Sequence, residues 1–214
     1  MSHWYIIPMI NMSFLVRHSR LVILLLVVVL GFGVTAVLFS GGEDTMHRRQ
    51  RTEIDGIPLT VLDEGFQYPI QLTSEQWKQI MPPMTYQVMR AKGTERAFAN
   101  PLWDNKEPGI YYSAATGQPL FHSDDKYDSG TGWPSFTKPI SPDAVHYLGD
   151  YSMFMARVEV VDSQSGSHLG HVFMDGPGPS GRRYCMNSAS LIFVPEGGEP
   201  PIIQGLQEAL ENRP

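Results

Sequence analysis

The sequence has a single cysteine, Cys185, among its 214 residues. One thiol cannot form an internal disulfide, so no disulfide framework holds this chain together. Basic residues are also scarce, because 16 Lys and Arg stand against 22 Asp and Glu. Only Arg17 and Arg20 fall within the first 40 residues, so the remainder carries a net charge of −8. This balance argues against a basic binding face, and we expect no nucleic-acid partner.

One long apolar run is present at residues 21–39, LVILLLVVVLGFGVTAVLF, and it contains no charged residue. A helix needs about 20 such residues to cross a bilayer. A cleaved signal peptide is the main alternative, but its apolar stretch is typically shorter and AVLFSGG is a poor cleavage site. The sequence therefore predicts an N-terminal segment at 1–20 and an uncleaved, single-pass transmembrane helix at 21–39.

The orientation of this helix follows from the charges at its ends. Arg17 and Arg20 border the N-terminal end, whereas Arg48, Arg49 and Arg51 follow the C-terminal end after an acidic pair. The counts are nearly balanced, and the closeness of the first two arginines favours an N-terminus in the cytoplasm. We expect the folded part to lie on the extracytoplasmic (periplasmic) side, where thiols tend to be oxidised.

The polar residues 40–71 are typical of a linker with a short ordered piece, IPLTVL at 57–62, and residues 72–214 fit one ordinary domain. Two short helices are expected at its start. Thr73 and Gln76 in TSEQWKQIM form a capping-box pattern, and Pro82 ends that helix. MTYQVMRAKG predicts a second helical stretch that ends at Gly93.

Strand patterns dominate after Gly109. GIYYSAATGQPLF reads as two strands around a Thr-Gly turn, and MFMARVEVVD alternates, with Val158 and Val160 on one face and Arg157 and Glu159 on the other. HLGHVFM and RYCMNSASLIFVP supply further strands, and GLQEALENRP predicts a short helix. The predicted fold class is mainly β, with antiparallel strands after short N-terminal helices.

Cys185 stands in RRYCMNSAS between cations and an amide. A lone cysteine is most often a small buried hydrophobic residue. Here Arg182 and Arg183 favour the thiolate, which is the nucleophilic form. Asn187 is two residues further along and is expected on the same strand face, where its amide can hydrogen-bond a group that reacts at the sulfur.

Two further stretches are candidates for chemistry. SHLGHVF places His168 and His171 close together, and histidine carries protons near neutral pH, although a purely structural pair has the same spacing. A metal pair is disfavoured because no cysteine or acidic cluster accompanies the histidines at ligand spacing. In DSGTGWPSF, Trp133 sits in a tight loop, either as plain packing or as the wall of an apolar pocket.

Three motifs in this order, SGTGWPSF, HLGHVF-x-DGP and RYC-x-NSASL, resemble the methionine-R-sulfoxide reductase B family. GTE at 93–95, FANPLWDNKEPGIY and PLF at 119–121 also match, and the resemblance covers about residues 72–195. It implies a fold of two antiparallel β-sheets with short N-terminal helices. It also implies an oxidoreductase that repairs oxidised proteins by reducing protein-bound methionine-R-sulfoxide to methionine.

The resemblance implies a role for each motif residue. Cys185 is the expected nucleophile, which attacks the sulfoxide sulfur and becomes sulfenic acid. His168, His171 and Asn187 are expected to bind and protonate the sulfoxide oxygen, because that oxygen leaves poorly until it is protonated. Trp133 is expected to line the pocket for the substrate methyl group, and Arg183 to stabilise the thiolate.

The chain departs from the family pattern at two places. Many members hold a structural zinc with two C-x-x-C pairs, and the matching positions here read Ser113-Ala-Ala-Thr116 and Asp162-Ser-Gln-Ser165. We therefore expect a zinc-free form without a cofactor. Members with a resolving cysteine often carry it where this chain has Thr131. An external thiol reductant, thioredoxin-like or small, is therefore expected to reduce the sulfenic acid.

Two other classes of function are alternatives. A cysteine hydrolase would use the same residue types, but in papain-like enzymes the cysteine precedes the histidine and the asparagine. A non-catalytic, membrane-tethered relic that binds oxidised proteins is the remaining alternative, and the complete cysteine, tryptophan and histidine motifs disfavour it.

Overall fold

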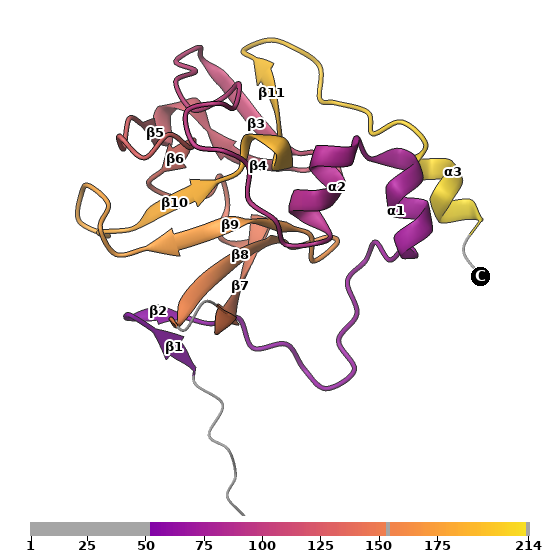
Figure 1. The fold of residues 1–214 in the computed structure, drawn as a ribbon, viewed down its shortest axis with the longest axis horizontal. Coiled ribbons are helices and arrows are strands. Elements are labelled where there is room, and N and C mark those ends of the chain that lie inside the picture. Colours follow the sequence, from indigo (N-terminus) through magenta and orange to yellow (C-terminus); the bar gives the residue numbers. More distant parts are fainter. Residues whose placement is uncertain (1–51, 153–154, 213–214) are drawn as a thin grey trace, which may run out of the picture. The chain divides into compact units, whose positions relative to one another are not determined.

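The computed structural model describes residues 52–152 and 155–212, which belong to one compact unit. The predicted transmembrane segment at 21–39 lies outside these residues. Within the described ranges, no helix has both the length and the apolar character needed to span a bilayer. Figure 1 shows strands through most of the unit and a few short helices, which confirms the mainly β class.

The segment predicted as a linker is ordered from residue 52 onward. It begins with a hairpin of β1 (Glu53–Ile54) and β2 (Ile57–Pro58), in which Ile54 and Ile57 are buried in the core. The Ile70 N–H donates to the Gln164 carbonyl, so the end of this segment is also attached. The ordered part of this segment extends beyond the expected piece at 57–62, because Ile54 also joins the buried core cluster.

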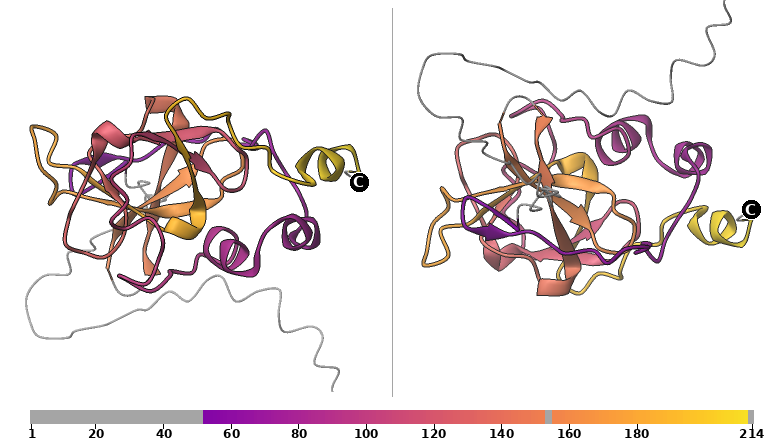
Figure 2. Two further views of the ribbon diagram at one scale, coloured as in Figure 1. Left: turned by 90° about the horizontal axis from the view of Figure 1, so that it is seen from above. Right: turned by 90° about the horizontal axis from the view of Figure 1, so that it is seen from below.

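The two expected helices are present. Helix α1 (Ser74–Ile80) starts at the predicted capping box, since the Thr73 Oγ1 accepts from the Gln76 N–H and the Gln76 side chain accepts from the Thr73 N–H. Helix α2 (Pro83–Met89) ends four residues before Gly93. Helix α3 (Leu206–Glu211) confirms the predicted C-terminal helix. Figure 2 shows the three helices grouped beside the strands.

Two antiparallel sheets form the body of the unit. The larger sheet has the order β5-β6-β10-β9-β8-β7 and the smaller has the order β11-β3-β4. The strands of the larger sheet are β5 (Lys126–Tyr127), β6 (Ser135–Phe136), β7 (Val145–Asp150), β8 (Arg157–Asp162), β9 (His168–Phe173) and β10 (Arg183–Met186). Those of the smaller are β3 (Gly109–Ser113), β4 (Pro119–His122) and β11 (Leu191–Pro195). Short 3-10 turns lie at Ser123–Asp125, Pro142–Ala144 and Ser188–Ser190.

Aromatic side chains join the two sheets. Phe136 of β6 stacks on Phe121 of β4, with ring centroids 4.4 Å apart, and meets Tyr111 of β3 edge-on at 5.0 Å. Tyr184 of β10 contacts the same cluster and is 1% exposed. Because strand residues alternate between faces, this cluster turns Arg183 and Cys185 to the other face of β10.

Candidate active site

Cys185 lies on an inner strand of the larger sheet, between two cross-strand neighbours. Its Cα pairs with Ser135 of β6 on one side and with His171 of β9 on the other. Directly opposed residues of antiparallel strands project their side chains from the same face. The next strand adds Glu159, which pairs with His171. The register therefore builds a row of a hydroxyl, a thiol, an imidazole and a carboxyl.

The environment of the thiol raises the pKa of Cys185. Burial is the main cause, and it is opposed by the charge of Arg183 and by hydrogen bonds from Arg183 and the hydroxyls of Thr131 and Ser135. The net direction differs from the expected stabilisation of the thiolate by two arginines. Strand alternation explains part of the difference, because Arg182 lines a cavity with Tyr184, on the opposite face from Cys185.

Arg183 is fixed beside the sulfur by a carboxylate. Its Nε and Nη2 donate to the two carboxylate oxygens of Asp175, both at 2.8 Å. The guanidinium also lies over the ring of Phe173, 4.6 Å from its centroid. A bidentate pair holds the planar group in one orientation. Asp175 was visible in the sequence only as part of the DGP motif.

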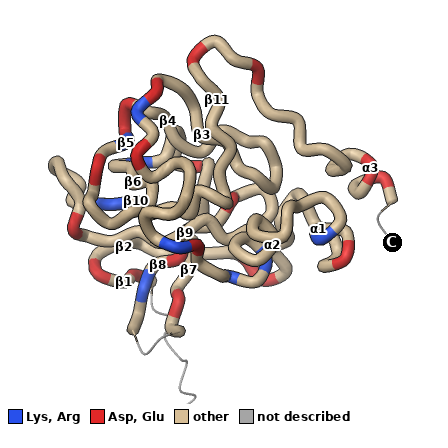
Figure 3. Tube along the Cα trace, turned by 45° about the horizontal axis from the view of Figure 1, so that its top comes forward, with Lys and Arg blue, Asp and Glu red and all other residues tan. Residues whose placement is uncertain are grey.

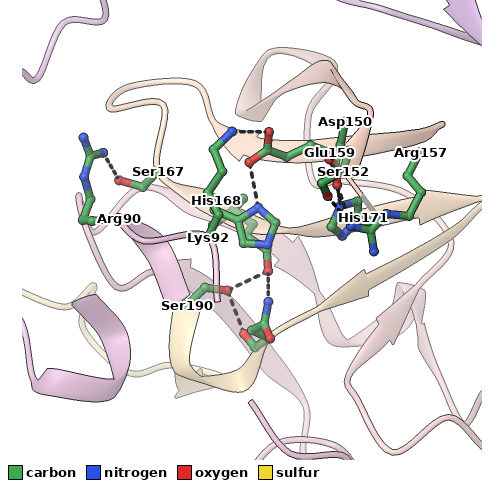
Figure 4. A network of polar contacts seen from close by, with 12 residues as sticks. Arg90, Lys92, Asp150, Ser152, Arg157, Glu159, Ser167, His168, His171 and Ser190 are labelled. Atoms are coloured by element: carbon green, nitrogen blue, oxygen red, sulfur yellow. Dashed lines mark hydrogen bonds and ion pairs between the residues drawn. The ribbon is translucent and has the colours of Figure 1, made fainter. Parts of the chain in front are cut away.

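His168 is held by a buried acid. Its Nδ1 lies 2.8 Å from Glu159 Oε1, and the Lys92 Nζ donates to Glu159 Oε2, also at 2.8 Å. His168 and Glu159 are both 3% exposed. Burial alone would raise the pKa of Glu159, but the hydrogen bonds from His168 and Lys92 outweigh it and lower that pKa. Figure 4 shows Glu159 between its two partners.

His171 has a carboxylate and a cation of its own. Its Nε2 lies 2.8 Å from Asp150 Oδ2, and the Arg157 Nη2 donates to the same oxygen at 2.6 Å, an arrangement seen in Figure 4. Burial opposes ionisation of Asp150, but hydrogen bonds from Ser152 and His171 and the charge of Arg157 hold its pKa well below the usual range. Asp150 is therefore an acceptor, so the neutral imidazole donates from Nε2 and keeps Nδ1 as its free acceptor.

Burial lowers the pKa of His171, and the hydrogen bond to Asp150 opposes this shift only in part. The ring is therefore mostly neutral at neutral pH and able to take up a proton. The rings of His168 and His171 lie 5.3 Å apart, centroid to centroid. The structure thus brings both predicted histidines to the side of Cys185 that faces β9. No sequence signal identified their carboxylate partners.

Asn187 lies one residue beyond the end of β10, in extended conformation. Strand β10 ends at Met186, and a 3-10 turn begins at Ser188. The Asn187 Oδ1 accepts from the Glu95 N–H at 3.2 Å, and its Nδ2 donates to the Leu169 carbonyl at 3.1 Å. The side chain is buried and ties three separate segments together.

Trp133 is tied to the same segment as Asn187. Its Nε1–H donates to the Glu95 carbonyl at 3.2 Å. The Glu95 carboxylate accepts the Ser188 N–H and, at 2.9 Å, the Ala189 N–H. Glu95 thus links the tryptophan loop to the end of β10. In the sequence, Glu95 stood out only as the last residue of GTE, one of the less distinctive stretches that match the family.

The four positions that correspond to zinc cysteines in the resemblance lie together, in two neighbouring turns. The Thr116 Oγ1 donates to Asp162 Oδ2 at 2.8 Å, and Asp162 Oδ1 accepts the Ser165 N–H at 3.0 Å. The Ser113 Oγ caps its own turn by accepting the Ala115 N–H. Across the described residues, no group of three or more His, Cys, Asp or Glu side chains is arranged to hold a metal ion.

Comparison with known proteins gives a consistent result. The model of the SelR domain family matches residues 81–195, more than half of the chain. The chain is 55% identical over 130 residues to "Peptide methionine sulfoxide reductase MsrB" of Methanosarcina barkeri, covering 61% of this chain and 92% of the relative. The protein of the same name from Methanosarcina mazei is 57% identical over 130 residues, covering 61% and 93%. "Methionine-R-sulfoxide reductase B3, mitochondrial" of Mus musculus is 44% identical over 154 residues, covering 72% and 61%.

Proposed function

The chain belongs to the SelR domain family, and we infer that it is an oxidoreductase that reduces methionine-R-sulfoxide in oxidised proteins to methionine. The family resemblance of the three motifs is thereby confirmed. The single observation that carries the chemistry is the cross-strand row in which Cys185 stands between Ser135 and His171. This row places a nucleophile directly beside a proton carrier.

In the proposed reaction, the Cys185 sulfur attacks the sulfoxide sulfur, and the oxygen passes to Cys185. The thiol and the sulfoxide become a sulfenic acid and a thioether, so the thiol proton ends on the transferred oxygen. His171 is the better candidate for carrying that proton, because it neighbours Cys185 and its Nδ1 is free when Nε2 donates to Asp150. His168 is further enclosed and orients the polar side of the site.

The remaining site residues take supporting roles in this proposal. Trp133 walls the position of the substrate methyl group, held by its bond to Glu95. Arg183 offsets the burial of the thiol and stabilises the thiolate when it forms. Asn187 uses one amide N–H for Leu169, and we assign its second N–H to the sulfoxide oxygen, directly or through water.

We further propose that the enzyme is zinc-free and uses no cofactor. The hydrogen bond between Thr116 and Asp162 joins the two turns that a Cys₄ zinc site would join. Because Cys185 is the only cysteine, no second thiol in the chain can resolve its sulfenic acid. An external reductant, either a thioredoxin-like protein or a small thiol, completes the proposed cycle.

Residues 21–39 support a proposal about location. Their uncharged, apolar composition fits a single-pass membrane anchor after residues 1–20, with the catalytic domain on the extracytoplasmic (periplasmic) side. The partners in this proposal are the membrane itself, oxidised methionine-containing proteins and the thiol donor. Figure 3 shows acidic and basic residues intermixed along the described chain, which fits the expectation of no nucleic-acid partner.

The function is tested with the full-length protein in detergent and dithiothreitol as reductant. We expect turnover of the R epimer of dabsyl-methionine sulfoxide, with the S epimer as the internal control that stays unreduced. Cys185→Ser is expected to abolish turnover, because a hydroxyl does not form the thiolate-type nucleophile at neutral pH. Equal turnover by this variant would remove Cys185 from the mechanism.

A further inference from the structure

Two aromatic side chains beside the tryptophan loop have no role in the reaction just described. Phe98 and Trp103, here called the aromatic ledge, meet edge-on with ring centroids 5.3 Å apart. Phe98 is 57% exposed, although its ring is large and apolar. Its backbone φ is +58°, which bulky residues rarely adopt. A strained, exposed phenylalanine is a feature that a purely structural role does not require.

The aromatic ledge is attached to the loop that carries Trp133. The Phe98 N–H donates to the Gly132 carbonyl at 2.9 Å, and the Asn100 Nδ2 donates to the same oxygen at 2.8 Å. The Phe98 ring lies so close to Gly132 that a Cβ there would come within 2.6 Å of it. The Phe98 ring is thus packed against the backbone just before Trp133.

Trp103 also lines a cavity of about 420 Å³. Tyr127 and Asp128 form part of its wall. The Lys126 Nζ donates a hydrogen bond to the Trp103 carbonyl oxygen at 3.1 Å. Tyr127 pairs with Ser135, which pairs with Cys185, so the cavity wall and the thiol lie two strands apart on the same face. Two strand spacings are about 10 Å, roughly the length of three residues of extended chain.

The lining of this cavity indicates the kind of ligand. Its charged residues have both signs, namely Asp104, Lys106, Glu107, Lys126 and Asp128. Such a mixture favours neither a positively nor a negatively charged ligand. It does offer hydrogen-bond donors and acceptors to the amide groups of a peptide backbone. The aromatic walls favour apolar side chains. Both features suit an extended polypeptide.

We propose that the aromatic ledge and this cavity form a subsite for the polypeptide segment that flanks the oxidised methionine. An apolar side chain within about three residues of the sulfoxide packs on Phe98 and Trp103. The subsite rests on the proposed function and narrows its substrate class to methionine sulfoxide with an apolar side chain close to it in the polypeptide. It also gives Phe98 a role in specificity, away from the reacting atoms.

The test compares three R-sulfoxides on the full-length protein in detergent with dithiothreitol. They are N-acetyl-methionine sulfoxide amide, a heptapeptide with a central sulfoxide and serine flanks, and the same heptapeptide with leucine flanks. Phe98→Ala is expected to lower kcat/KM about tenfold for the leucine peptide, mainly through KM, and to leave the amide unchanged. The matched control is Phe66→Ala, since Phe66 is also exposed but contacts Tyr68 and His146 instead.

The possible outcomes separate the two proposals. A selective loss on the leucine peptide supports the subsite. An equal loss on all three substrates would show that Phe98 acts only through the tryptophan loop, which would overturn the subsite and leave the reductase function intact. Equal kcat/KM of the parent protein for the serine and leucine peptides would also overturn it. If no R-sulfoxide is reduced by the parent protein, the proposed function fails, and the subsite with it.

Discussion

At the scale of single residues, the thiol of Cys185 is subject to opposing influences. Burial raises its pKa, whereas Arg183, Thr131 and Ser135 lower it, and burial dominates. A raised pKa means that less thiolate is present at neutral pH than for a free cysteine. We expect the rate of Cys185 alkylation by iodoacetamide to increase at a higher pH than the rate for a model thiol. Mass spectrometry of the alkylated protein between pH 6 and 10 measures this difference.

Two neighbouring arginines provide a matched pair for this prediction. Arg183→Gln removes the cation beside the sulfur and is expected to slow alkylation at neutral pH about tenfold. Arg182→Gln is the control, because Arg182 lines the cavity on the opposite face of the sheet. An equal effect of both substitutions would show that general surface charge, and not the local contact, controls the thiol.

Glu95 acts through the groups that it holds. Burial raises its pKa, and the hydrogen bonds from the Ala189 and Ser188 N–H groups oppose the shift. In Glu95→Gln, the amide NH₂ faces a backbone donor, and an unsatisfied buried group costs about 1–3 kcal/mol. We expect a lower free energy of unfolding in urea and reduced turnover, because Trp133 and Asn187 are both bonded to the Glu95 backbone. Glu199→Gln, at an exposed site, serves as the control.

At the scale of elements, a buried carboxylate connects two neighbouring turns. Asp162 is fully buried and accepts hydrogen bonds from Thr116 in the β3–β4 turn and from the Gln164 N–H in its own turn. Thr116→Val keeps the side-chain shape but leaves one carboxylate oxygen without this donor. We expect the free energy of unfolding in urea to fall by about 1–3 kcal/mol. Turnover at urea concentrations below the unfolding transition should stay unchanged.

The control for this substitution is Thr52→Val, at an exposed position before β1. Unfolding of the parent protein is also measured with and without a strong zinc chelator. A lower midpoint with the chelator would contradict the zinc-free proposal, and an unchanged stability of Thr116→Val would show that the turns are held by other contacts.

Local signals in the sequence predicted several elements. Contacts between residues far apart in the sequence could not be predicted in this way. The capping box of Thr73 and Gln76 needs only four consecutive residues, and the hairpin around Gly117 needs only a turn and two strands. Ile57 belongs to the expected ordered piece of the linker, but nothing nearby in sequence indicated that Ile54 would also be buried. The contact of Asn187 with Glu95 joins residues 92 positions apart, so no local pattern in the sequence indicated it.

The same limit applies to the site. Cys185, His168, His171 and Trp133 stand in recognisable motifs, so their participation could be proposed from sequence. Asp150 and Glu159 could not be, because their contacts with the histidines depend on the register of β7, β8 and β9. The direction of the thiol pKa could not be predicted either, since it depends on burial.

At the scale of the whole molecule, the proposed membrane anchor has an orientation that determines which thiol donors can reach the site. Helix α3 is the last described element and most of its residues are at least partly exposed, so a C-terminal reporter leaves the fold undisturbed. We expect alkaline phosphatase fused there to be active in cells and a fluorescent protein to be dark, because phosphatase needs an oxidising compartment for its disulfides. Deleting residues 21–39 should reverse both signals. A bright fluorescent fusion of the intact chain would place the domain in the cytoplasm.

The position of β10 inside the larger sheet has a consequence for motion. Its backbone is paired on both sides, by β6 and by β9, so the strand opens only when much of the sheet does. Amide hydrogens of Tyr184 and Cys185 therefore belong among the slowest to exchange with deuterium, and those of the tryptophan loop among the faster. We therefore expect Cys185, the proposed nucleophile, to stay in place through each catalytic cycle, while the loops around it move for substrate entry and product release.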